Sequence, residues 1–501
     1  NFYILAPKSK AEKFLALKRE ISKLLLNIHS GSIYVALDYI SLCPADFKRF
    51  NVQWKRVGDK IDNQKRKKWS EIGLKENYSF LFGPFSSGSK EKEHCRLCGI
   101  EKEKRKIKYD PESEISRCSF CASFEKLTNS IKKADCLVVK ESKGHIDKIE
   151  VYQDAFRLFG YEYNFCSAKE MSTNDFKQAY LLNDTNFLQK TYQGYRLGAL
   201  KLPLKNEGTG LTFKEIAEGS QGDAKLALLK LDIDNLGYLF SDGFGKNATI
   251  SRVTSLSRML GLYFEGYINH LIAENQWENY LYVVFSGGDD TFVIGAWDKV
   301  MDFVQKFYDQ FKEFTGGADS VITFSAGVCI FNYDYPLIMS FQLTEEALDK
   351  AKSFLGEGEN TPQKNKICLF GEVFNWEEFK RIKEFKNLLL RIIETNSNKK
   401  GDFGRAFLFR IGKTVLGFKK ILEDSLQGKV DNLRFWRLAY YLRDISRKDA
   451  EELIGQYREI VVNNLVQKSR DKKIENIMIV PAAVKWAQME TRKRGEGENE
   501  R

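Results

Sequence analysis

The sequence contains no long apolar run. None of its stretches approaches the roughly 18 consecutive apolar residues of a membrane-spanning helix, so no membrane span is expected. The N-terminal stretch NFYILAPKSK has neither the basic start nor the small-residue cleavage site of a secretion signal, so a reducing cytoplasm is the expected location. An initiating Met is also absent, which leaves open that the chain is a fragment of something longer.

An acidic excess is absent as well. Lys and Arg number 79 against 68 Asp and Glu, and the net charge of +11 favours a polyanionic partner such as nucleic acid or nucleotide. Hydrophobic residues make up 43% of the chain and aromatic residues 13%, which indicates packed globular domains and not disorder. The 501 residues are too many for one core, so about two to four domains are expected.

Nine cysteines are present, and four of them form a pattern typical of a metal site. Two C-x2-C pairs are separated by the 19 residues 99–117, and their members are Cys95, Cys98, Cys118 and Cys121. Each pair can point two thiolates at one ion, and the two pairs together complete the tetrahedron of a zinc site. Four protein ligands leave no open position, so this zinc should be structural and not catalytic. The alternatives are reduced thiols without metal, or a disulfide.

The first part of the chain is interpreted as an α+β domain. Residues 1–7 and 32–42 are predicted strands, and apolar spacing over residues 11–28 predicts a helix. The cysteine element occupies roughly residues 91–130, and strands and a helix resume over residues 131–205. We therefore interpret the cysteine element as an insertion or a linker.

A second α+β unit is predicted over residues 206–374. Its elements are, in order, a long apolar strand ending in LDID, a helix over 249–276, a hairpin over 281–297, a helix over 298–314, a strand over 321–331 and a helix over 344–356. The order β-α-β-β-α-β is that of the split βαβ, or ferredoxin-like, fold.

From residue 375 onward the pattern becomes helical. Asn375 and Glu378 resemble a capping box. A buried face should follow at Phe379, Ile382, Leu389 and Ile392. We expect an all-helical domain over residues 375–501.

The hairpin of the second unit carries the stretch SGGDD at residues 286–290. One interpretation is a plain turn, because Gly supplies positive φ and Asp forms local hydrogen bonds. The other is a loop that holds Asp289 and Asp290 out toward metal ions, with Gly287 and Gly288 allowing the backbone to approach a triphosphate closely.

The first strand of this unit ends close to that hairpin in the predicted sheet. Asp232 should therefore lie beside Asp289 and Asp290, and Asp234 should point to the same side if the strand persists. Converging carboxylates repel each other, and a divalent cation relieves the repulsion. Two such ions can activate a hydroxyl and stabilise a leaving oxygen. Lys352 is a candidate phosphate contact, although a solvated helix residue is the plainer reading.

Four segments together resemble one known family. LKLDIDNLGYLF, SRVTSLSRMLGLYFEGYINHLI, VVFSGGDDTFVIGAW and SAGVCIFNYDYPL are similar to the second palm domain in the large subunit of type III-A (Csm-type) CRISPR–Cas effector complexes. The resemblance extends over the whole chain. It implies an α+β multidomain protein with two ferredoxin-like palm domains, a zinc element and a C-terminal helical domain. The implied boundaries are 1–90 and 131–205 for the first palm, 91–130 for the zinc element, 206–374 for the second palm and 375–501 for the helices.

The family also implies an activity and partners. Its members synthesise cyclic oligoadenylates from ATP with Mg²⁺ or Mn²⁺ when the guide-loaded complex pairs with target RNA, in antiviral defence. The implied partners are the other Csm-type subunits, notably the neighbour that binds the 5′ end of the guide RNA, together with guide and target RNA.

The resemblance assigns roles to individual positions. Asp289 and Asp290 match the GGDD carboxylates, Asp232 matches the metal-binding aspartate of the first palm strand, and the Ile233 carbonyl would be a further ligand. Lys352 corresponds in type to a lysine after the last palm strand. The residues that would line the nucleotide are Ser286, Gly287 and Gly288.

One departure from the family concerns a nuclease. Relatives usually carry an N-terminal histidine–aspartate domain that cuts single-stranded DNA. This sequence has four histidines, and none of them precedes an Asp: His29, His94, His145 and His270. We therefore expect no deoxyribonuclease activity, whether that domain was removed or is naturally absent.

Two other functions remain open. The chain could be a catalytically idle scaffold that binds guide and target RNA, and the basic and aromatic stretch LRFWRLAYYLR is compatible with RNA contact, although core packing is the plainer reading. It could also be a free-standing nucleotide cyclase. Whether the chain is a free-standing cyclase or a cyclase within an effector complex, a cleft between its two palms is a hypothetical site for two ATP molecules.

Overall fold

The structure is a computed structural model, and it describes most of the chain. It describes residues 3–492 except for 30, 74, 84–93, 102–104, 112–114, 143–145, 147, 172–175, 190–191, 200, 206–208, 318–319, 357–359, 397–402, 416–435, 444 and 463–476. Two compact units result: Asn1–Leu200 with Asn235–Gly266, and Lys201–Asp234 with Tyr267–Arg501. Across the described ranges, no helix is both long and apolar enough to cross a lipid bilayer.

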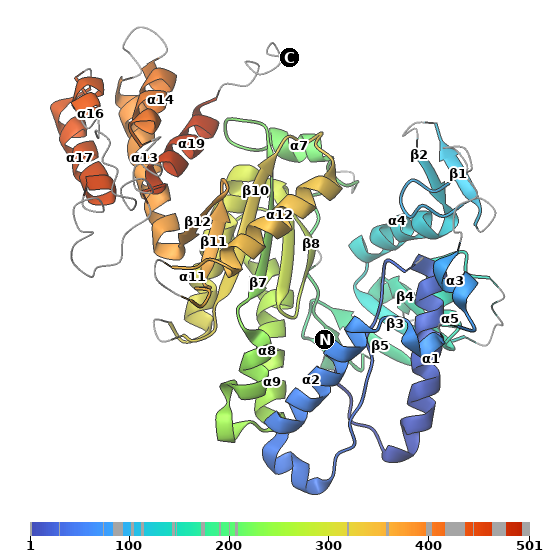
Figure 1. Ribbon diagram of the computed structural model, residues 1–501. Coiled ribbons are helices and arrows are strands. Elements are labelled where there is room, and N and C mark those ends of the chain that lie inside the picture. Colours follow the sequence, from blue (N-terminus) through green and yellow to red (C-terminus); the bar gives the residue numbers. More distant parts are fainter. Residues whose placement is uncertain are drawn as a thin grey trace. The chain divides into compact units, whose positions relative to one another are not determined.

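The first unit begins with helices. They are α1 (Ala11–His29), α2 (Phe50–Arg66) and the short α3 (Tyr78–Phe82) (Figure 1). The helix predicted over residues 11–28 is confirmed, but the strands predicted at 1–7 and 32–42 are wrong. The described parts of both stretches are neither helix nor strand. Alternating apolar residues favour a strand only where a neighbouring strand takes up the backbone hydrogen bonds, and none pairs with these stretches among the described residues.

The four-stranded sheet of this unit lies entirely after the cysteine element. Its strands are β3 (Cys136–Glu141), β4 (Tyr161–Cys166), β5 (Gln178–Leu182) and β6 (Gly194–Arg196) in the order β4-β3-β5-β6, with β5 and β6 parallel. Two short helices, α5 (Tyr152–Arg157) and α6 (Ala168–Met171), connect the strands. The described strand order differs from the ferredoxin-like order expected for this part of the chain, in which the first and last strands would be neighbours.

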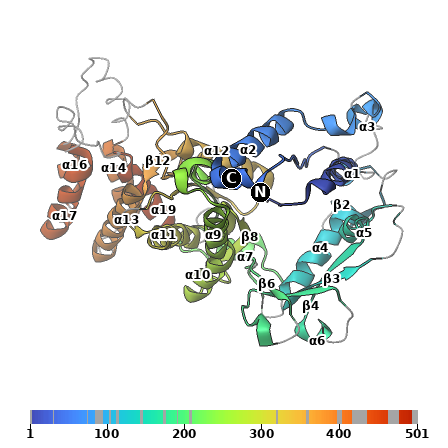
Figure 2. The same cartoon turned by 90° about the horizontal axis from the view of Figure 1, so that it is seen from below.

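The cysteine element contributes a small hairpin and a helix to the first unit. The hairpin pairs β1 (Ile107–Asp110) with β2 (Ile115–Cys118), and α4 (Ser119–Lys132) follows directly. Helix α4 contacts β4 of the sheet (Figure 2). The element is therefore joined to the α+β part that follows it.

The second unit is built on a six-stranded sheet in the order β12-β11-β10-β7-β9-β8. Its strands are β7 (Leu226–Ile233), β8 (Leu281–Gly287), β9 (Asp290–Ala296), β10 (Phe324–Phe331), β11 (Lys366–Leu369) and β12 (Glu372–Asn375). Each neighbouring pair among β10-β7-β9-β8 is antiparallel, and β10 and β7 are neighbours as in a ferredoxin-like sheet. The predicted topology is confirmed here, with the β11–β12 hairpin added beside β10.

The helices predicted between these strands are present with changed bounds, and residues 250–266 of the first of them belong to the first unit. The sequence predicts one helix over 249–276; the structure has α9 (Ile250–Gly261), a π-helical segment (Leu262–Tyr267) and α10 (Ile268–Glu274). Helix α11 (Trp297–Phe314) matches its prediction, whereas α12 (Leu337–Lys352) begins seven residues before residue 344. Helix α12 packs on β10, β7 and β11.

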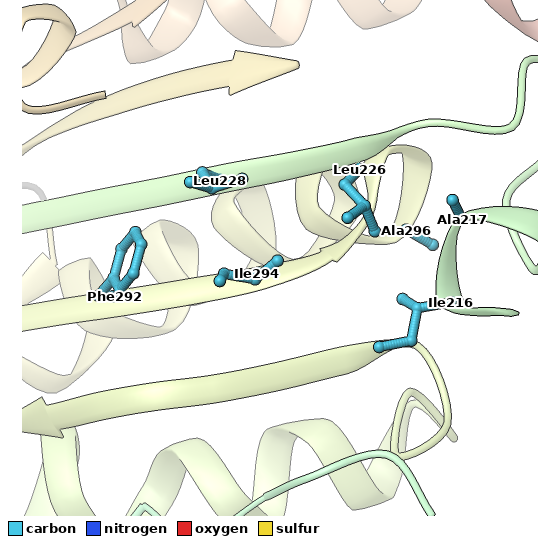
Figure 3. Packing of buried hydrophobic residues seen from close by; sticks show 7 residues of the cluster. All are labelled: Ile216, Ala217, Leu226, Leu228, Phe292, Ile294 and Ala296. Carbon is cyan, nitrogen blue, oxygen red and sulfur yellow. The ribbon is translucent and has the colours of Figure 1, made fainter. Parts of the chain in front are cut away.

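One side of the sheet is closed by the short helix α7 (Phe213–Glu218). Its Ile216 and Ala217 meet alternate residues of β7 and β9, as Figure 3 shows. The strand residues of this cluster are Leu226, Leu228, Phe292, Ile294 and Ala296. Because side chains alternate along a strand, Lys230 and Asp232 lie on the same face as Leu226 and Leu228.

The C-terminal part of the second unit is helical, as predicted. Its described helices are α13 (Trp376–Asn396), α14 (Phe403–Val415), α16 (Trp436–Tyr441), α17 (Arg447–Tyr457) and α19 (Ile479–Thr491). Helices α13 and α14 both contact α19 (Figures 1 and 2). The capping box is confirmed, because the Asn375 amide donates to Glu378 Oε2 at 2.6 Å and the Glu378 amide donates to Asn375 Oδ1 at 2.8 Å. The predicted face is buried, at Phe379, Ile382, Leu389 and Ile392.

Part of the stretch LRFWRLAYYLR lies outside the described residues. Core packing was the plainer interpretation of this stretch. Within α16, however, Tyr440 is exposed and is not part of a packed face. Residues 416–435 and the charged end of the chain after residue 492 also lie outside the described residues.

Candidate functional site

The four predicted cysteines come together in the first unit. Their sulfur atoms all lie within 4.8 Å of one another, and the Sγ atoms of Cys98 and Cys118 are 3.7 Å apart. A tetrahedral zinc ion with Zn–S bonds of about 2.3 Å places its sulfurs about 3.8 Å apart. The Cys98–Cys118 separation matches that spacing, and all four sulfurs are near enough to share one ion. Cys95 and Cys118 are fully buried, which agrees with a structural ion shielded from solvent.

The local chain shows how the two C-x2-C pairs are shaped. Gly99 takes a φ of 70°, and its amide donates to the Cys95 carbonyl at 2.8 Å, which turns the chain back after the first pair. Cys118 is the N-cap of α4 and accepts a hydrogen bond from the Cys121 amide at 3.4 Å. Hydrogen bonds from the Cys121 and Cys98 thiols lower the pKa of Cys118, which favours the thiolate that a metal takes.

The predicted carboxylates of the second unit gather at one end of its sheet. Asp232 on β7 is the register partner of Asp290 on β9, and Asp290 in turn pairs with Gly287 on β8. The Ile233 amide donates to the Asp289 carbonyl at 3.0 Å, so the tip of the hairpin is fastened to the end of β7. The structure thus places Asp232 beside the SGGDD hairpin.

The hairpin residues also satisfy the turn interpretation. Gly288 takes a φ of 67°, a conformation that favours glycine, and nothing lies within 4 Å of the position that a Cβ would occupy. The hydroxyls of Ser286 and Thr291 are 2.7 Å apart across the hairpin. The open space over Gly288 leaves room for a ligand to approach the backbone.

Lys352, at the last residue of α12, contacts the Asp232 carboxylate. Burial, with smaller contributions from the positive charges of Lys364 and Lys230, lowers the pKa of Lys352 from 10.5 to about 8. The contact with Asp232 acts the other way and favours the charged form. Lys352 is therefore a partly buried cation held at the Asp232 carboxylate.

Asp234 does not join the other carboxylates. Strand β7 ends at Ile233, and the buried Asp234 carboxylate accepts hydrogen bonds from the Thr323 hydroxyl at 2.8 Å, the Ser325 hydroxyl at 2.8 Å and the Asn365 amide at 2.9 Å. The expectation for Asp234 depended on a persisting strand, and β7 ends at Ile233; its carboxylate nevertheless bonds to Ser325, the register partner of Asp232 on β10. Asp234 instead holds β10 and the segment before β11 to the end of β7.

Comparisons with known proteins identify the family of this chain. The family described as Cas10/Cmr2, second palm domain, matches residues 225–368, which include both β7 and the hairpin, and the family described as Csm1 subunit domain B matches residues 1–84. A Methanocaldococcus jannaschii protein named CRISPR system single-strand-specific deoxyribonuclease Cas10/Csm1 (subtype III-A) is 30% identical over 424 residues, 75% of this chain and 52% of that protein. The chain belongs to the Cas10/Csm1 family.

Other members of this Cas10/Csm1 family are more distant. The Mycobacterium tuberculosis protein of the same name is 26% identical over 457 residues, 82% of this chain and 51% of its own length. The chain thus spans about half the length of these curated relatives. A crystal structure of a Csm1–Csm4 cassette in complex with pppApApA is similar in fold, with a TM-score of 0.65 at 18% identity. The match covers 97% of this chain and 60% of the chain in that structure.

The aspartates of this Cas10/Csm1 chain offer oxygen ligands that suit a divalent cation. Asp290 Oδ1 is buried and has no hydrogen-bond partner among the described residues. This oxygen is therefore available as a hard ligand for a divalent cation. Asp232 already accepts a cation, the Lys352 ammonium. In the described part of the chain, however, only the four cysteines form a group of three or more ligand side chains with all donor atoms within 4.8 Å. The aspartates therefore offer suitable oxygens but do not converge as tightly as the cysteines.

Lys230 is a residue of this site that the sequence reasoning missed. It lies on β7 two positions before Asp232, on the same face, and its Nζ is 3.9 Å from Asp290 Oδ2. Burial raises the pKa of Asp290, and the positive charge of Lys230 opposes that rise. A signal was present, because Lys230 is a lone charge inside the otherwise apolar run LALLKL.

Proposed function

We propose that this chain is the large subunit of a type III-A effector complex and that its SGGDD hairpin is a nucleotidyl-transfer centre. There, ATP is converted into cyclic oligoadenylates when the guide-loaded complex binds target RNA in antiviral defence. The pairing of Asp232 with Asp290 at the tip of the hairpin is the observation that carries the proposal. Similar structures solved with pppApApA, cA4 and AMPPNP support the class of substrate and product.

The proposed reaction joins ATP molecules through 3′–5′ bonds. The 3′-hydroxyl of one ATP loses its proton to solvent and its oxygen forms a bond to the α-phosphorus of another, the bond from that phosphorus to the β-phosphate breaks, and pyrophosphate leaves. Mg²⁺ or Mn²⁺, held by Asp232, Asp289, Asp290 and the Ile233 carbonyl, would activate the attacking hydroxyl and stabilise the leaving oxygen.

The remaining site residues bind and orient the triphosphate. The open backbone at Gly288 lets phosphate oxygens approach closely, and we place Ser286 and Gly287 beside the nucleotide as well. Lys352 is positioned to exchange its contact with Asp232 for one with phosphate, because a metal on Asp232 would displace its ammonium.

We propose the following division of the chain. Residues 1–90 and 131–205 form a first palm, 91–130 the zinc element, 206–374 the catalytic palm and 375–501 the helical domain. The match of residues 225–368 to the second palm family supports the third of these assignments.

The proposed partners are the other Csm-type subunits, among them the neighbour that binds the 5′ end of the guide RNA. Guide and target RNA would be reached through that complex. The similarity to structures of Csm1–Csm4 cassettes supports the first part of this proposal. We do not extend the deoxyribonuclease activity of the named relatives to this chain, because none of its four histidines is followed by Asp.

The test is direct synthesis. The chain, assembled with its partner subunits, guide RNA and target RNA, is incubated with ATP and Mg²⁺ or Mn²⁺, and the products are analysed for 3′–5′ linked oligoadenylates. Replacing both Asp289 and Asp290 with Ala should abolish the product while the complex still assembles and still binds target RNA. Unchanged product formation by that variant would show that the chemistry lies elsewhere.

The same experiment separates the two alternatives. A catalytically idle RNA-binding scaffold predicts no product from the wild-type complex under any of these conditions. A free-standing cyclase predicts full activity from the chain alone, without partner subunits or target RNA.

A further inference from the structure

Lys230 occupies an unusual position for a lysine. It lies within β7, one of the central strands, where its register partners are Phe292 on β9 and Gly327 on β10. Only 8% of its surface is exposed. A buried ammonium is costly unless an opposite charge accompanies it, so the surroundings of Lys230 must supply one.

Helix α12 supplies that charge because it lies unusually close to the sheet. A Cβ on Gly327 would lie 2.4 Å from the Leu348 nitrogen and 2.7 Å from the Thr344 oxygen, so the helix backbone rests directly on β10 where Lys230 is the register partner. The next helix residue, Glu345, makes its contact with Lys230 here. The Phe341 ring, one turn earlier, lies 5.1 Å from the Lys230 Nζ.

The same ammonium reaches one of the proposed catalytic carboxylates, that of Asp290. Its Nζ is 3.9 Å from Asp290 Oδ2, whereas Asp290 Oδ1 is buried and has no hydrogen-bond partner in the described part of the chain. One oxygen of Asp290 therefore faces a fixed cation, and the other remains available.

We propose that Lys230 is a positioning residue that holds Asp290 through Oδ2, so that Oδ1 is presented as a ligand, and that Glu345 of α12 holds Lys230 in turn. The inference rests on the proposed metal-dependent chemistry at Asp290. Glu345 and Asp290 share one cation, so the strength of the Lys230–Asp290 contact depends on Glu345, and helix α12 thereby sets how readily a metal can take Asp290.

This arrangement predicts opposite effects on the half-saturating Mn²⁺ concentration from substitutions at Lys230 and at Glu345. In Lys230→Met, Asp290 loses both its orientation and its competing cation, so the maximal rate falls while the half-saturating Mn²⁺ concentration falls too. In Glu345→Gln, Lys230 turns fully to Asp290, so the half-saturating Mn²⁺ concentration rises. Each shift should be roughly three- to tenfold, as expected for a partly buried charge at this distance. The double variant should behave as Lys230→Met, because Glu345 acts through Lys230.

The experiment measures the initial rate of oligoadenylate synthesis against Mn²⁺ concentration in the assembled complex. Lys225→Met is the matched control, since Lys225 immediately precedes the same strand at its opposite end and pairs with Asp223 at 3.4 Å. Its Mn²⁺ dependence should equal that of the wild type. Glu345→Gln changes a part-exposed side chain, so the test does not depend on the folding of Lys230→Met.

The possible results distinguish failure of the positioning role from failure of the proposed nucleotidyl-transfer function. If Asp290→Asn retains full synthesis, the proposed function fails and this inference fails with it. If Asp290→Asn is inactive but Glu345→Gln and Lys230→Met both keep the Mn²⁺ dependence of Lys225→Met, only the positioning role is overturned. A fall in rate with unchanged Mn²⁺ dependence would assign Lys230 a purely structural role.

Discussion

Asp232 and Asp290 face each other as register partners across β7 and β9, and the Asp289 carbonyl accepts a hydrogen bond from Ile233 beside them. A central strand and a hairpin tip thus bring together carboxylates that are 58 positions apart in the chain (290 minus 232). Substitutions at the end of β7 therefore test the proposed chemistry of this unit.

Asp232 and Asp234 should give opposite results although they are two residues apart. Asp232→Ala should lower the rate of oligoadenylate synthesis by about 100-fold or more, because it removes a proposed metal ligand. Asp234→Ala should instead lower the free energy of unfolding by about 2–3 kcal/mol, because the partners at Thr323, Ser325 and Asn365 lose their acceptor. Chemical denaturation and initial rates measure the two effects. Equal losses of stability would contradict the assignment.

Lys352 should give the reaction an alkaline limb. Its pKa is lowered to about 8, so its ammonium is charged below that pH and neutral above it. If it binds triphosphate, kcat/KM for ATP should fall as the pH rises through about 8. Lys352→Arg keeps its charge at every pH tested and should move this limb upward. The idea fails if wild type and Lys352→Arg share one pH profile.

The cysteine cluster should determine zinc content and stability, and not chemistry. Replacing Cys95 and Cys98 with Ser should lower bound zinc from about one ion per chain toward zero and lower the unfolding midpoint. The rate per folded complex should be retained. Cys43→Ser changes an exposed thiol outside the cluster and is the control for both measurements. Unchanged zinc in the double variant would exclude this site.

The helical domain should depend on one buried ion pair. Lys386 Nζ lies 2.8 and 3.1 Å from the two Glu490 carboxylate oxygens, and the two side chains are only 7% and 9% exposed. Lys386→Met alone leaves a buried carboxylate without its partner and should cost about 3–5 kcal/mol of unfolding free energy. Adding Glu490→Leu should recover most of that loss. A double variant as unstable as the single one would argue against the pair.

Local patterns in the sequence determined much of this architecture. The cysteine spacing, the capping box at Asn375 and Glu378, and the β-α-β-β-α-β order of the second unit all depend on residues near one another in the chain. Their hydrogen bonds and apolar periodicity arise within a few residues, so no distant partner is needed to predict them. The position of Asp232 beside the hairpin followed from that topology.

Tertiary structure alone decided the rest. The stretches 1–7 and 32–42 were predicted as strands, the second from its alternation, but neither has a pairing neighbour among the described residues. The orientation of Asp234 depends on where β7 ends. Lys230 meets Glu345 across 115 positions because Gly327 lets the α12 backbone rest on the sheet. Strand pairing, side-chain direction and buried charge pairs depend on the distant segment that packs against each residue. The sequence close to a residue does not identify that segment.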